Sequence, residues 1–162
     1  MDHQTFAALL DQFTAAGCAN DGARFSGLFT EDGTYEDDFF GLFRGRAGIA
    51  GMLQRFHDTG ENYRWDFGDL VTDGAIGYAT FRFSFASKMP GYEAKPVLIT
   101  GISCFRFEGD KIAGYRETFD TGIALAQLGF PADRIKRVLD KEAAAQNATS
   151  GAREHLDRFT GA

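Results

Sequence analysis

The apolar residues of this chain change their spacing once, near residue 60, and that change constrains the fold more than any other feature. Before this point they recur every three to four positions, which is typical of amphipathic helices; such stretches cover residues 5–19, 22–29 and 46–58. From residue 62 onward the period is two, as in NYRWDFGDLV and ATFRFSFAS, which indicates β-strands. Helices followed by a run of strands predict an α+β fold.

Turn residues divide the second half of the chain into strands. Asp73-Gly74 predicts a hairpin, and residues 88–95 and 108–111 predict further connections. PVLITGISCFRFE, residues 96–108, is apolar on both faces, so we expect both faces to be covered. The order of elements predicts a cone-shaped barrel, in which a curved antiparallel sheet wraps around N-terminal helices. A short helix and a longer C-terminal helix, ending near residue 145, follow the last strand.

The length and composition predict one domain. The 162 residues suit a single core, which we place in residues 1–146. Residues 147–162 are small and polar, and we expect them to form a flexible tail. The cone leaves a second apolar sheet face, which predicts a homodimer.

Charge and patterning bear on partners and location. The formal net charge of −6 argues against nucleic acid and anionic membranes as partners. No apolar run approaches the roughly 20 residues that span a bilayer, and no signal-peptide pattern is present. Cys18 and Cys104 match no metal or redox spacing, which indicates reduced thiols in a cytoplasmic protein.

Two segments resemble known families. DGARFSGLFTEDGTYEDDFFGLFRGRAGIAGML resembles the start of the nuclear transport factor 2-like superfamily, which has the cystatin-like fold. GISCFRFEGDKIAGYRETFDTGIALAQLGF resembles the SnoaL-like polyketide cyclases. The resemblance covers about residues 5–130 and implies the fold. It leaves the reaction open, because the superfamily contains isomerases, cyclases, dehydratases, epoxide hydrolases and non-catalytic adaptors.

Asp120 has two interpretations. It matches the position of the acid/base aspartate of the SnoaL-like cyclases, and an apolar pocket would raise the pKa of such a carboxyl toward working pH. It also precedes a helix, where a short carboxylate caps free N–H groups. Arg116 lies four residues earlier on the same strand, where it would orient Asp120 or hold an anionic ligand.

Asp37 is the second acid/base candidate, because it aligns with the general base of the ketosteroid isomerases, which this chain resembles in Thr-x-Glu-Asp. The strand pleat would place Tyr35 on the same face as Asp37, whereas the alternative is a solvated acidic turn. The oxyanion-hole tyrosine of that family falls on Phe13, which cannot donate a hydrogen bond. Its protonated aspartate falls on Ser103, a weaker donor, so classical ketosteroid isomerase activity is not expected.

The remaining candidates concern the pocket and its ligand. Trp65 lies on the aromatic side of its strand and would stack on a flat ligand, or else pack in the core. No His pair has zinc spacing and no phosphate-binding loop is present, so we expect no cofactor and no metal. We therefore expect a cofactor-independent isomerase or lyase for a hydrophobic cyclic small molecule, with Asp120 and Asp37 catalytic and Tyr35, Trp65, Ser103, Arg116 and Phe13 around the substrate. The alternative is a non-catalytic ligand-binding or dimeric interaction module.

Overall fold

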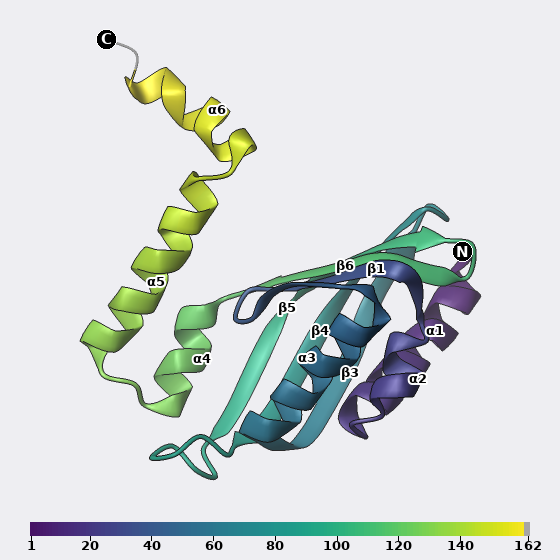
Figure 1. The fold of residues 1–162 in the computed structure, drawn as a ribbon, viewed down its shortest axis with the longest axis horizontal. Coiled ribbons are helices and arrows are strands. Elements are labelled where there is room, and N and C mark those ends of the chain that lie inside the picture. The colour runs from purple at the N-terminus through teal and green to yellow at the C-terminus, as the bar shows by residue number, and fades with distance from the viewer. Residues whose placement is uncertain (161–162) are drawn as a thin grey trace.

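The computed structural model describes residues 1–160 and contains three helices, a six-stranded sheet and three further helices (Figure 1). The elements are α1 (His3–Cys18), α2 (Gly22–Ser26), β1 (Phe29–Asp37), β2 (Gly41–Arg44), α3 (Gly45–Thr59), β3 (Gly60–Thr72), β4 (Ile76–Ser87), β5 (Pro96–Glu108), β6 (Lys111–Phe119), α4 (Thr121–Leu128), α5 (Ala132–Asn147) and α6 (Ser150–Thr160).

The α+β prediction is confirmed, with one difference in the sheet. The strand order is β2-β1-β6-β5-β4-β3. The strands from β3 to β6 form the expected antiparallel meander, but β1 runs parallel to β6, so the sheet is mixed. This pairing brings the end of the first strand next to the last strand, although some 80 residues separate them in the chain. It is the contact that assembles the candidate site.

The N-terminal helices lie along the concave side of the sheet (Figure 1). Asp2 caps α1 by accepting a hydrogen bond from the N–H of Thr5 at 2.8 Å, and the helix buries an apolar stripe that includes Phe6, Leu9 and Phe13. The predicted helix over residues 22–29 is shorter than expected. It ends at Ser26, because residues from Phe29 onward pair with β6.

The centre of the core is aromatic. The ring of Phe13 is completely buried and lies 4.6–6.3 Å, between ring centroids, from six other aromatic rings. Tilted and edge-to-face pairs of this kind are favourable beyond the area that they bury. These rings come from α2, β1, β3, β5 and β6: Phe25, Phe29, Trp65, Phe67, Phe105 and Tyr115.

The convex face of the sheet carries apolar side chains that no element within residues 1–160 covers. Four of its apolar side chains, Val71, Tyr78, Leu98 and Ile102, are between 46% and 59% exposed. The expectation that both faces of residues 96–108 are covered is therefore wrong for the single chain. The homodimer, which would cover this face, stays a prediction.

The C-terminal part projects from the sheet-and-helix body as α5 and α6 (Figure 1). Its attachment includes a hydrogen bond of 2.6 Å from the Thr121 hydroxyl to Glu142. The segment expected as a tail from residue 147 is helical over Ser150–Thr160, and its last two residues lie outside the described part. The boundary at residue 146 and the flexibility beyond it stay predictions. No helix within residues 1–160 is long and apolar enough to span a bilayer.

We predict that Gly101→Ala lowers the free energy of unfolding by about 1–3 kcal/mol, the usual cost of overpacking. Gly101 pairs with Phe81, and a Cβ atom there would lie 2.3 Å from the Thr118 carbonyl oxygen and 2.8 Å from the Phe81 ring. Gly51→Ala is the control, because it lies in the exposed interior of α3 with no atom within 4 Å of the added carbon. We expect that change to stabilise by about 0.5–1 kcal/mol. Urea unfolding measures both, and equal stabilities for the two variants would contradict the packing seen at Gly101.

Candidate functional site

A cavity of about 270 Å³ lies between the concave face of the sheet and helices α3 and α4. Ten of its seventeen lining residues are aromatic and four are aliphatic or methionine, so the wall is almost entirely apolar. The polar exceptions are Thr59 and two carboxylic acids, Asp37 and Glu117. The apolar members are Phe39, Phe40, Phe56, Tyr63, Trp65, Phe81, Phe83, Phe85, Met89, Ile99, Phe119, Leu125, Leu128 and Phe130.

Asp37 ends β1 and is held by the backbone that follows it. Its Oδ1 accepts hydrogen bonds from the N–H groups of Phe39 at 2.7 Å and Phe40 at 2.6 Å. The residue is only 5% exposed, so the interpretation as a solvated acidic turn is wrong for Asp37; it describes its exposed neighbour Asp38. Burial raises the pKa of the Asp37 carboxyl above its ordinary value, and hydrogen bonds from Glu117 and from the two N–H groups oppose that rise.

Glu117 reaches the same cavity from β6. It is 6% exposed, and its Oε2 accepts a hydrogen bond of 2.5 Å from the Tyr115 hydroxyl. The Tyr115 oxygen lies 2.9 Å from the Ser103 hydroxyl, which extends the network to β5. Burial, followed by the negative charge of Asp37, raises the pKa of Glu117 well above its ordinary value. Glu117 therefore stays protonated where an exposed glutamate is ionised.

The two carboxyl groups behave as one unit. The interaction between them lowers the pKa of Asp37 and raises that of Glu117, so Glu117 is the member of the pair that holds a proton more readily. Two like charges in an apolar site cannot both be present, and the two backbone N–H groups make Asp37 the better place for the charge. Asp37 is therefore the member of the pair that ionises first, and Glu117 keeps its proton to higher pH.

Asp120 and Arg116 lie elsewhere. Asp120 is exposed, is not among the cavity residues, and accepts a hydrogen bond of 3.0 Å from the N–H of Ile123 as the N-cap of α4. This geometry supports the capping interpretation of Asp120, and its catalytic role stays a prediction. Arg116 is exposed on the convex face, because Tyr115 and Glu117 on either side of it are buried.

The other predicted ligand contacts fall into two groups. Trp65 lines the cavity. Phe13, Tyr35 and Ser103 are completely buried behind it and are not among the lining residues. Tyr35 shares the inward face with Asp37, as the strand pleat predicts, and its ring lies 4.5 Å from that of Tyr115. These three residues support the Tyr115–Glu117 network or the core around it, and their contact with a substrate stays a prediction.

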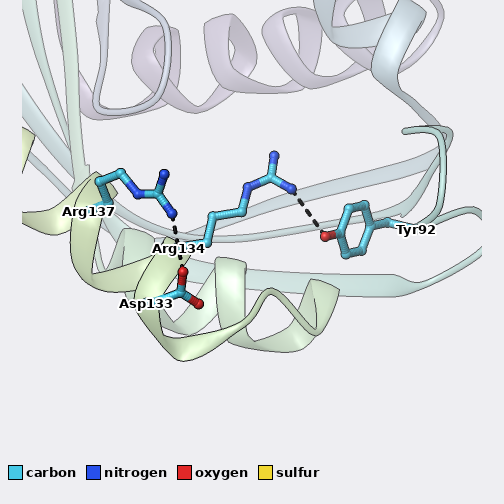
Figure 2. Close-up of polar contacts among 4 residues, drawn as sticks. All are labelled: Tyr92, Asp133, Arg134 and Arg137. Atoms are coloured by element: carbon cyan, nitrogen blue, oxygen red, sulfur yellow. Dashed lines mark hydrogen bonds and ion pairs between the residues drawn. The ribbon is translucent and has the colours of Figure 1, made fainter.

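Phe130 forms part of the cavity wall, and Arg134 lies against its ring. The guanidinium carbon of Arg134 lies 3.8 Å from the Phe130 ring centroid, and Arg134 donates a hydrogen bond of 3.1 Å to the Tyr92 hydroxyl. Figure 2 shows Arg134 reaching toward Tyr92 while Arg137 pairs with Asp133. Because Arg134 is exposed, its charge lies outside the cavity, and the Tyr92 loop and the start of α5 close this side together.

Glu117 is the site residue that the sequence analysis did not select. It stands in the same Tyr-Arg-Glu-Thr-Phe-Asp run as Asp120, and Tyr115, Glu117 and Phe119 alternate with Arg116 and Thr118. The period of two already placed an acid on the face that carries Tyr115 and Phe119. Residues 1–160 contain no group of three His, Cys, Asp or Glu side chains arranged to hold a metal ion.

Comparison with known proteins relates the chain to a family and its fold. A model of the SnoaL-like domain matches residues 7–115. A search of curated proteins finds no match. Among solved structures, a protein with a ketosteroid isomerase-like fold from Catenulispora acidiphila, in complex with trimethylamine, is 25% identical with a TM-score of 0.70, covering 77% of this chain and 95% of its own.

Two further structures share the fold at lower identity. An epoxide hydrolase of limonene epoxide hydrolase-like type from M. tuberculosis is 19% identical with a TM-score of 0.61, covering 75% of this chain and 86% of its own. A nuclear transport factor 2-like protein from Burkholderia thailandensis is 18% identical with a TM-score of 0.63, covering 76% and 96%. Since the family model spans more than half of the sequence and the fold agrees, the chain belongs to the SnoaL-like domain family.

Proposed function

We propose that the protein is a cofactor-independent isomerase, cyclase or dehydratase that moves a proton on a hydrophobic cyclic small molecule. Asp37 is the base and Glu117 is the acid. The observation that carries the proposal is that the only two carboxyl groups among the seventeen lining residues lie next to each other in an aromatic cavity. The reaction class is proton transfer at a carbon beside a carbonyl group.

Asp37 suits the role of base. Its pKa is raised by burial, which brings its basicity closer to neutral pH, while its two backbone hydrogen bonds favour the ionised form and orient it. Those bonds occupy Oδ1 and leave the other oxygen for the shared proton or a substrate hydrogen.

Glu117 suits the role of acid. A protonated carboxyl group donates a strong hydrogen bond to the oxygen of a forming enolate, and an apolar site makes that bond worth more than in water. The hydroxyl of Tyr115 orients Glu117 by donating a hydrogen bond to it, and the Ser103 hydroxyl is the next member of this hydrogen-bond network. In the ketosteroid isomerases a tyrosine and a protonated aspartate donate these hydrogen bonds, and their positions are occupied here by Phe13 and Ser103. Glu117, on β6, supplies an acidic hydrogen-bond donor in their place.

The cavity limits the size and polarity of the substrate. A volume of about 270 Å³ falls at the low end of known ligand sites and suits a molecule of one or two rings. The aromatic wall favours an apolar, flat body. The trimethylamine held by the Catenulispora acidiphila relative supports small-molecule binding in this fold.

The second candidate is a non-catalytic ligand-binding module of the same fold. The observation that favours it is that Asp37 is already bonded to two N–H groups and to Glu117, which also describes a purely structural turn. In that case the cavity binds its ligand without proton transfer.

The first test is exchange of the α-hydrogens of 2-tetralone, a two-ring ketone, in deuterated water, followed by proton NMR. We expect the wild-type protein to accelerate exchange and Asp37→Asn to lose about 100-fold or more of that acceleration. Asn keeps an oxygen for the Phe39 and Phe40 N–H groups, so the turn is preserved.

Asp120→Asn, measured in the same assay, distinguishes the role of Asp120 from that of Asp37. Asn is as good an N-cap as Asp, so α4 remains capped and only a proton-transfer role would be lost. We expect this variant to keep the wild-type exchange rate. A loss of rate in Asp120→Asn, with none in Asp37→Asn, would show that Asp120 is the base. No acceleration by the wild type on a panel of one-ring and two-ring ketones would favour the binding module.

The second test concerns the protonation of Glu117. A carboxyl group whose pKa is raised on folding stabilises the protein fully below its unfolded pKa, ordinarily about 4.5, and that stability is lost as pH rises toward the folded pKa. Glu117→Gln mimics the neutral acid at every pH. We therefore expect its unfolding free energy, measured in urea between about pH 5 and 8, to fall less steeply than that of wild type, by at most about 1.4 kcal/mol per pH unit.

Glu36→Gln, on the exposed face of β1, is the control and should follow wild type. Parallel curves for wild type and Glu117→Gln would contradict a protonated Glu117.

A further inference from the structure

The two carboxyl groups of the cavity have no cationic side chain beside them in its wall. The described lining contains no Lys, Arg or His, so the charge that Asp37 acquires on ionisation is not balanced within it. Neither acid belongs to any of the ion pairs found within residues 1–160, which join Arg64 to Asp66, Lys136 to Asp140 and Arg137 to Asp133. Buried charges are normally paired, so this cavity lacks a counter-charge.

The aromatic wall of the cavity also favours a positively charged ligand. The face of an aromatic ring is negative and attracts cations, with Trp the strongest of the three ring types. Among the ten rings of the wall, Phe130 alone has a described side-chain cation over it, and that cation, Arg134, lies on the outer side. The other nine rings, Trp65 included, have no described side-chain cation over them.

We propose that the natural ligand of this cavity is a hydrophobic organic cation, in which an ammonium or iminium nitrogen is attached to an apolar ring. The nitrogen lies against the Asp37–Glu117 pair and supplies the missing charge, and the ring lies among the aromatic side chains. The inference rests on the carboxyl pair of the proposed function, and it adds the charge of the ligand, which proton transfer on a ketone does not require.

The test compares two probes of the same shape by isothermal titration calorimetry in slightly acidic buffer. They are (3-hydroxyphenyl)trimethylammonium and 3-tert-butylphenol, which differ only in the charged nitrogen that replaces a carbon. We expect the cation to bind wild type with a Kd at least about tenfold lower than the neutral probe, given desolvated cation–aromatic contacts and a facing carboxylate.

Two variants locate the charge preference. Asp37→Asn removes the ionised group while keeping the size of the side chain, and we expect the two probes then to bind with similar Kd. Glu36→Gln removes one acid from the exposed face of the same strand and should keep the preference. Repeating the titrations in about 0.5 M salt excludes attraction by the net charge of the surface, because such long-range attraction is screened. Circular dichroism melting curves confirm that each variant is folded.

Several results would overturn the inference: equal or tighter binding of the neutral probe to wild type, an unchanged preference in Asp37→Asn, or binding of neither probe at millimolar concentration. The tetralone exchange assay tests the proposed proton transfer independently of the preference for a cationic ligand. Catalysed exchange without a preference for the cation removes only the ligand class. A preference for the cation without catalysed exchange keeps the ligand class and removes the proton transfer.

Discussion

Two carboxyl groups placed side by side in an apolar cavity are the constraint on which the rest of the site depends. Since both cannot be ionised there, one must hold a proton, and the surroundings decide which one. Two backbone N–H groups stabilise charge on Asp37, whereas burial and the neighbouring charge of Asp37 hold Glu117 in its neutral form, although the Tyr115 hydroxyl that donates to it lowers its pKa. The division into base and acid therefore follows from the hydrogen bonds to Asp37 and from the burial of Glu117 on the neighbouring strand.

The aromatic residues that build the core also form the cavity. Phenylalanine accounts for 17 of the 162 residues, and Phe13 sits at the centre of a cluster to which several elements contribute. Rigid rings on a concave sheet cannot fill the space beneath α4 completely, so a volume of about 270 Å³ remains. Its wall is stabilised by the same ring contacts as the core, and the site is consequently preformed.

Much of the fold followed from the sequence, but the site followed only in part. Periodicity and turn residues placed the helices and the strands of the meander, and Asp37 was selected by its resemblance to the isomerase base. The cyclase resemblance points to Asp120 in the run that also contains Glu117, and it does not single out Glu117. In the structure the strand ends at Phe119, so Asp120 caps a helix while Glu117 faces the cavity.

The sequence by itself determined the class and order of most elements and the inward face of the alternating strands, because hydrophobic periodicity is a local property that burial imposes on neighbouring residues. Only the tertiary structure decided that β1 lies parallel to β6, and hence that Asp37 meets Glu117. No local pattern encodes that pairing, since it joins segments some 80 residues apart. The protonation of the pair depends on it as well, because burial and the proximity of a like charge arise only when the two strands are brought together.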